Sequence, residues 1–88
     1  MKMHELKTIN PYFTDVWDAR KTFEIRKDDR GFENDDILWL REYDTTTGYS
    51  GREIISHVTY LIPVNGFEGI VSGYCVMGID VLERRTRK

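Results

Sequence analysis

The pattern of apolar and polar positions predicts that most of this chain forms β-strands. Residues 3–9 alternate between apolar and polar side chains, and so does the long stretch 52–62, which Pro63 ends. The segment 37–43 begins with four consecutive apolar residues, which is typical of a central strand that is covered on both faces. A last strand is predicted over residues 74–82.

One short helix is predicted after the first strand. Asn10 and Pro11 form a favourable helix start, with Asn10 as the N-cap and Pro11 at the first helical position. Apolar residues then recur at helical spacing, so the helix is expected to run to about Ala19 and to lead into a strand over residues 21–27. The apolar positions of this helix are Tyr12, Phe13, Val16 and Trp17.

The strand predicted over residues 21–27 carries three charged side chains at fixed spacing. Its alternation predicts that Phe23 and Ile25 face the core, while Glu24 and Arg26 share the opposite face. Lys21 stands at the junction between helix and strand. If the three charges converge, they could bind an anionic ligand or shift one another's pKa values. On an exposed strand the same residues would form an ordinary surface ion pair that adds little stability.

Turn-forming residues separate the predicted strands. A turn is expected at residues 28–31, a hairpin loop at 44–51 and a further loop at 65–69. The charged tail 83–88 is expected to fray. Five strands with one early helix therefore indicate an α+β domain that is mostly β, a small and partly open barrel that spans residues 1–88 as a single domain.

Composition narrows the possible functions. The chain has 88 residues and a net charge of -2, so it is no general polycation, and any contact with nucleic acid must come from a local patch. Cys75 is the single cysteine and is expected to be buried. We see no cluster with metal-ligand spacing, no membrane-spanning run and no signal peptide, so we expect no metal, no cofactor and a cytoplasmic protein.

Residues 19–26, with the sequence ARKTFEIR, resemble the Gly-x-Lys-x-x-Glu-x-Arg signature of the ASCH superfamily of PUA-like β-barrels. The likeness covers roughly residues 3–80 and resembles a compact bacterial and phage branch of that superfamily. It implies a PUA-like barrel with a cleft at the junction of helix and strand, where RNA is proposed to bind. Lys21, Glu24 and Arg26 match the signature. Further matching segments are His4-Glu5-Leu6-Lys7, Asp36-Ile37-Leu38, Leu40-Arg41-Glu42, residues 47–54 and Gly73-Tyr74-Cys75-Val76-Met77.

The signature differs from this chain at its first position, where Ala19 replaces a glycine that could adopt a positive φ angle. The resemblance also suggests an enzyme. One bacterial member hydrolyses N4-acylated cytidines and is thought to use the motif lysine, a threonine three residues later and a distant glutamate. Lys21 matches the lysine, Glu24 stands at the threonine position, and Glu68 is the sole acidic residue in the short segment 63–73. Other relatives are reported as ribonucleases.

Three functions therefore remain open: RNA or nucleoside binding, hydrolysis, and a non-catalytic role with a protein partner. Lys21 and Glu24 would be the catalytic residues of a hydrolase. Among several candidate aromatic residues, Tyr12 included, Tyr49 in the predicted hairpin loop is the best exposed one for stacking on a base. The expected ligand-binding residues are Arg20, Lys21, Glu24, Arg26 and Tyr49.

Overall fold

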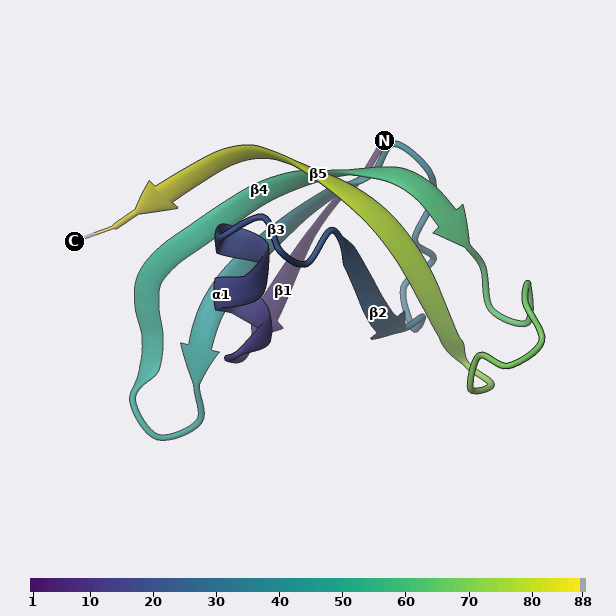
Figure 1. Ribbon diagram of the computed structural model, residues 1–88, viewed down its shortest axis with the longest axis horizontal. Helices are drawn as coiled ribbons and strands as arrows, with labels where there is room; N and C mark the ends of the chain where they lie inside the picture. The colour runs from purple at the N-terminus through teal and green to yellow at the C-terminus, as the bar shows by residue number, and fades with distance from the viewer. Residues whose placement is uncertain (88) are drawn as a thin grey trace.

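Five strands form one strongly bent sheet, and a single short helix lies beneath its arch (Figure 1). The computed structural model describes residues 1–87 of the 88-residue chain. The expected class, a mostly β and partly open barrel with one helix near the N-terminus, is confirmed. The elements are β1 (Met3–Thr8), α1 (Tyr12–Trp17), β2 (Phe23–Lys27), β3 (Ile37–Asp44), β4 (Gly48–Ile62) and β5 (Tyr74–Thr86).

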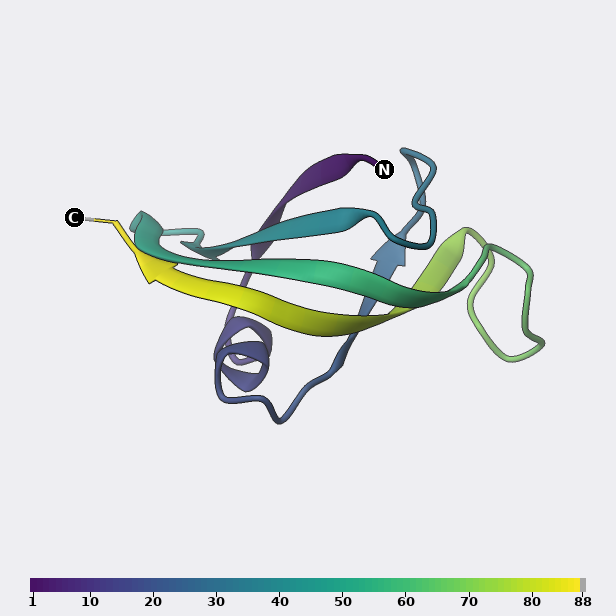
Figure 2. The same cartoon turned by 90° about the horizontal axis from the view of Figure 1, so that it is seen from above.

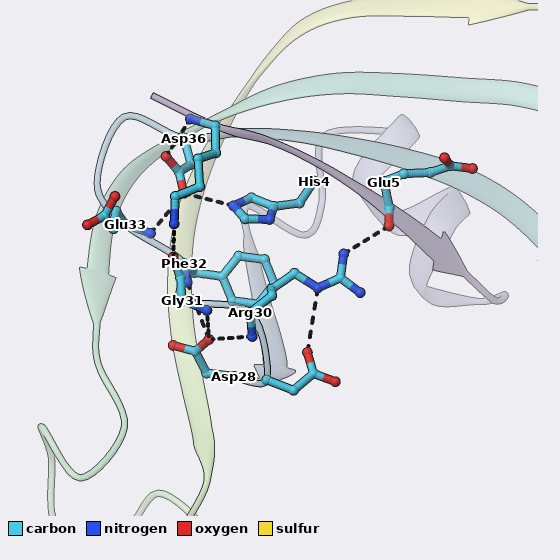
Figure 3. A network of polar contacts seen from close by, with 10 residues as sticks. His4, Glu5, Asp28, Arg30, Gly31, Phe32, Glu33 and Asp36 are labelled. Atoms are coloured by element: carbon cyan, nitrogen blue, oxygen red, sulfur yellow. Dashed lines mark hydrogen bonds and ion pairs between the residues drawn. The ribbon is translucent and has the colours of Figure 1, made fainter.

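The strand order β1-β3-β4-β5-β2 leaves β1 and β2 at the two edges of the sheet. β1 is parallel to β3, and every other neighbouring pair is antiparallel. Side chains bridge the seam between the two edges. Arg26 of β2 donates to the Lys7 carbonyl at 3.1 Å and to the Thr8 hydroxyl at 3.0 Å. Arg30 donates to the Glu5 carbonyl at 3.2 Å (Figure 3). Arginine side chains therefore link the two edges of this partly open barrel, which no backbone ladder joins.

The bend of the sheet comes from its two longest strands. β4 and β5 pair along most of their length, and their register shifts between Ile55 and Ser56 and again between Val58 and Tyr60. Such irregularities bend a strand and increase its twist. The arch leaves a concave side, which α1 covers (Figure 2). The helix is far too short to cross a membrane, and no other helix occurs in residues 1–87.

The core lies between α1 and the concave face of the sheet. Phe13 and Val16 of the helix are completely buried there. Cys75 is also buried, as expected, and burial raises the pKa of its thiol. The remaining buried apolar residues are Leu6, Phe32, Leu38, Leu40, Ile54, Val58, Met77 and Ile79.

The helix is shorter than its sequence predicts and starts one residue later. Pro11, and not Asn10, occupies the N-cap position and makes no side-chain capping bond, although the Asn10 amide oxygen accepts a hydrogen bond from the Thr14 backbone at 3.0 Å. At the other end Ala19 adopts φ +62°, and its N–H donates to the Val16 carbonyl at 3.0 Å. This left-handed residue ends the helix, which therefore does not reach Ala19.

The prediction that residues 83–88 fray is wrong for the part that the structure describes. β5 continues through Thr86 in register with β4, and the backbone N–H of Arg87 donates to the Gly51 carbonyl at 2.7 Å. The reason is that β4, with 15 residues, is longer than the 13-residue β5 and supplies hydrogen-bonding partners for this charged segment. Lys88 lies outside the described residues.

The predicted hairpin loop 44–51 is also shorter in the structure. Gly48 already pairs with Asp44, and Tyr49 pairs with Tyr43, so residues 45–47 make the turn. The Thr-, Ser- and Gly-rich composition of this segment indicates a loop. The backbone of β3 nevertheless forms hydrogen bonds with this segment, and the segment therefore becomes part of β4.

Candidate functional site

A cavity of about 750 Å³ opens where α1 leads into β2. Residues 7–9, at the end of β1, and Tyr12 and Asp15 of α1 form one wall. Residues 20–21 and 23–26 form the other wall. The cavity therefore lies at the junction of helix and strand, where the sequence places its charged motif.

The motif residues converge on one carboxylate at the cavity wall. Glu24 is 2% exposed. The Lys21 ammonium donates to the Glu24 carboxylate and, at 2.7 Å, to the Phe23 carbonyl. The Arg26 Nε donates to the other carboxylate oxygen at 3.0 Å. Both oxygens of a buried carboxylate are thus paired with a cation, which is the condition for keeping such a charge out of water.

The orientation of β2 is the reverse of the predicted one. Phe23 is 43% exposed and Ile25 is 54% exposed, whereas Glu24 is buried. Alternation divides a strand into two faces, but it does not determine which face turns inward. Here Glu24 and Arg26 turn inward because Arg26 bridges the seam to β1 and both cations compensate the buried carboxylate.

Two exposed aromatic rings flank the motif lysine. The Lys21 ammonium lies 5.9 Å from the centre of the Tyr12 ring and 5.1 Å from the centre of the Phe23 ring. Tyr12 is 52% exposed, so both rings present free surface at the cavity. The cavity therefore combines flat apolar surfaces with fixed positive charge, and it can accept a planar ring that carries an anionic group.

Tyr49 is 41% exposed, as predicted, but it lies outside this cavity, and its role as a stacking residue stays a prediction. Its ring packs on Tyr43, with ring centres 5.0 Å apart, and the Arg41 guanidinium lies 3.8 Å from its centre. Because the segment belongs to β4, the strand register directs Tyr49 onto Tyr43. Tyr12 is the tyrosine that lines this cavity. In the sequence, Tyr12 has helical spacing and resembles a core residue.

The turn after α1 positions Arg20 and Lys21. Their backbone N–H groups both donate to the Asp15 carbonyl, each at 2.9 Å. The turn requires the left-handed conformation of Ala19, at φ +62°. An alanine therefore adopts the conformation that the glycine of the signature would adopt readily, at a cost of about 1–2 kcal/mol for a residue with a Cβ atom.

Glu42 forms a second charge cluster, which the sequence gives little reason to expect. Arg52 donates to it through Nη2 at 2.7 Å and Nε at 2.9 Å, Ser50 donates at 2.5 Å and Asn10 at 2.6 Å. These bonds, the one from Arg52 first, lower the pKa of Glu42 to about 2. This carboxylate joins β3, β4 and the start of α1, and we regard it as structural.

Asp36 anchors the N-terminus in the same way (Figure 3). His4 Nε2 lies 2.8 Å from its carboxylate, and the backbone N–H groups of Lys2 and Glu33 donate at 2.9 and 3.0 Å. Burial raises the pKa of Asp36, but the hydrogen bonds from His4 and the two backbone groups outweigh it and bring the pKa below its usual value. This network connects β1 to the loop that precedes β3.

Residues 3–79 match the protein family that is described as a domain of unknown function (DUF3850). The chain belongs to this family. The match to DUF3850 includes all the residues that line the large cavity, whereas the C-terminal part of β5 lies beyond it. The DUF3850 chain is also 36% identical over 58 residues to the "Uncharacterized 12.9 kDa protein in GpA 3'region" of Escherichia phage P2. That alignment covers 66% of the chain and 52% of the phage protein, so the chain spans about half the length of this curated relative.

Proposed function

We propose that the large cavity binds one nucleotide unit, either within a single-stranded RNA or as a modified nucleoside. The observation that carries this proposal is the Lys21 ammonium, which lies between the exposed rings of Tyr12 and Phe23 in a cavity of about 750 Å³. A nucleobase would stack on one of these rings, an interaction worth about 1–3 kcal/mol per base.

Cations around the rings would hold the phosphate. Arg20 and Lys7 line the cavity beside the motif. Glu24 keeps Lys21 and Arg26 in place. The cavity lining holds four cations, Lys7, Arg20, Lys21 and Arg26, against the two carboxylates of Asp15 and Glu24. The charge presented to a ligand is therefore positive, although the whole chain has a net charge of -2.

The position of the cavity supports the relation to the ASCH superfamily as part of the same proposal. The resemblance places a ligand cleft at the junction of helix and strand, and the cavity lies at that junction. We accordingly propose a PUA-like ASCH domain that meets its RNA or nucleoside ligand in the cytoplasm.

Binding of a fluorescent single-stranded RNA hexamer across a salt series tests this proposal. We expect Lys21→Ala to weaken binding about tenfold and Arg20→Ala to weaken it less, because a ring-flanked cation contributes more than an exposed one. Each variant should also reduce the salt slope by roughly 0.7, the value for one lost phosphate contact on a single strand.

Lys2→Ala is the matched control, since it removes the same charge from a residue that does not line the cavity. Its binding and salt slope should equal those of the wild type. If the wild type binds neither the hexamer at low salt nor any of a panel of nucleosides, acylated cytidines included, the proposed function is wrong.

Hydrolysis of an N4-acylated cytidine is a second candidate, and the direct contact between Lys21 and Glu24 favours it. The Glu24 carboxylate would take a proton from water as the general base, and the Lys21 ammonium would stabilise the oxyanion that forms. Water would then attack the acyl carbon, the amide C–N bond would break, and cytidine and a carboxylic acid would be released. Chromatography of N4-acetylcytidine after incubation tests this, and Lys21→Ala and Glu24→Gln should both abolish any turnover.

A further inference from the structure

A second cavity of about 420 Å³ adjoins the first one. Ile25 lines both cavities, so the two cavities meet at this residue. The second cavity is largely apolar, and the loop that contains Ile70 and Val71 lines it together with Tyr74 and Val76. Val71 is 71% exposed, and Tyr74, at the start of β5, is 37% exposed.

The pairing of β2 with β5 places side chains from both strands at the second cavity. Ile25 lies opposite Val76, and Lys27 lies opposite Tyr74, in the antiparallel register. Residues two apart on a strand share one face, so Phe23, Ile25 and Lys27 follow one another along the outward face of β2. Lys27, an exposed cation, therefore lies beside Tyr74 of the second cavity, as Lys21 lies beside the aromatic rings of the first cavity.

We propose that the two cavities together form a groove for a single-stranded RNA of at least two nucleotides, with a second base on Tyr74 and Val71. This inference rests on the proposed function of the first cavity. Tyr74 lies opposite Lys27, four residues from Phe23, and this separation of about 13 Å along the strand is compatible with two steps of an extended nucleic-acid strand. Lys27 lies where the phosphate that follows the second base would pass.

The structure favours a nucleic-acid strand over an extended peptide in this groove. A peptide that adds a strand to a sheet needs a free backbone edge. The free edges of β1 and β2 face each other across the seam, and the Arg26 side chain spans it to Lys7 and Thr8. The alternation of aromatic rings with cations is instead the arrangement of single-strand binding grooves.

A length series tests the inference. Affinities for uridine 5′-monophosphate and for the dimer and tetramer of uridylate are measured with the wild type and with Tyr74→Ala. We expect the tetramer to bind at least tenfold more tightly than the monophosphate. Tyr74→Ala should remove about tenfold of the tetramer affinity and leave the monophosphate affinity unchanged, whereas Tyr74→Phe should retain both.

Tyr60→Ala is the matched control, because Tyr60 is 67% exposed and lines neither cavity. Lys27→Ala gives a second readout that does not depend on the ring, and it should lower the salt slope for the tetramer but not for the monophosphate. Circular dichroism of each variant confirms that it is folded.

The outcomes separate the two proposals. Equal affinity for monophosphate and tetramer, or equal effects of Tyr74→Ala and Tyr60→Ala, would overturn the groove while leaving the first cavity as a nucleotide site. Binding of an apolar peptide in place of RNA, lost in Tyr74→Ala, would also overturn it. Absence of binding to all three uridylates would overturn the groove, and absence of binding to the nucleoside panel as well would overturn the proposed function.

Discussion

Glu24 and Glu53 are both buried and both gather cations, yet their surroundings differ. Glu53 is 1% exposed, and the Nε atoms of Arg41, Arg85 and Arg87 lie 3.1, 3.3 and 3.0 Å from its carboxylate. These arginines come from β3 and from the C-terminal part of β5 and its continuation, so the cluster connects β4 to its surroundings. Glu24, in contrast, lies on the wall of the large cavity.

The aromatic residues near the two clusters make the same distinction. Arg41 and Arg87 cover the Trp39 ring, with their guanidinium carbons 5.0 and 5.6 Å from its centre. At the cavity, Tyr12 and Phe23 keep about half of their surface free, whereas Tyr49, which is 41% exposed beside Arg41, lies outside that cavity. A convergence of charges is therefore insufficient to mark a ligand site, because a buried carboxylate needs cations wherever it lies. Free aromatic surface in a concave setting is the feature that distinguishes the site.

The largest expected effect is on stability, from Glu53→Gln. The change leaves three arginines without their shared anion, and breaking a buried ion pair in this way costs about 3–5 kcal/mol. Urea unfolding should show a fall in the free energy of unfolding of that size, with RNA affinity unchanged at temperatures where the variant is folded. A loss of binding by the folded variant would remove the distinction between the two clusters.

The pH dependence of stability extends the comparison to Glu42. Its pKa in the folded protein is about 2, below the ordinary value of 4.5, so its contribution is complete above pH 4.5 and is lost as the pH falls toward 2. The shift corresponds to on the order of 3 kcal/mol. Urea unfolding between pH 7 and pH 2 should show this loss in the wild type and a much smaller loss in Glu42→Gln. An equally steep loss of stability in Glu42→Gln would contradict the assignment of this loss to Glu42. Glu68→Gln, at an exposed loop position, is the control.

Glu24→Gln should affect binding more than stability. Glu24 pairs with two cations, Lys21 and Arg26, whereas Glu53 pairs with three. We expect a loss of about 2 kcal/mol in the free energy of unfolding, the value of hydrogen bonds to charged groups. RNA affinity should fall as well, because the two cations are no longer held in place. A variant that is as destabilised as Glu53→Gln and still binds RNA would reverse the comparison.

The smallest effect is expected from Ala19→Gly, which restores the glycine of the signature. Glycine adopts φ +62° without steric cost, but it also makes the unfolded chain more flexible. The net result should be a gain of about 0.5–1 kcal/mol in the free energy of unfolding. Thermal and urea unfolding measure this gain, and RNA affinity should change less than twofold. A loss of stability would show that the turn holds Ala19 without strain.

Much of the secondary structure could be predicted from the sequence because it depends on local patterns. The alternation in residues 3–9 and 52–62 and the apolar run at 37–40 identified three of the strands. The motif spacing also brought Lys21, Glu24 and Arg26 into one candidate site, and the structure places them in contact. Local periodicity and spacing sufficed for these features.

Pairing between distant segments decided the features that local patterns do not reveal. The side of β2 that turns inward depends on the hydrogen bonds of Arg26 across the seam to β1. Tyr49 belongs to a strand because its segment pairs with β3. The segment up to Arg87 is ordered because β4 is long enough to pair with it. Each case joins residues far apart in the sequence, so no local pattern reveals it. The sequence by itself determined the elements and the charged motif. Only the tertiary structure decided that Glu24 is buried and that Tyr12 and Phe23 remain open to a ligand, because burial depends on which other strands and side chains lie alongside.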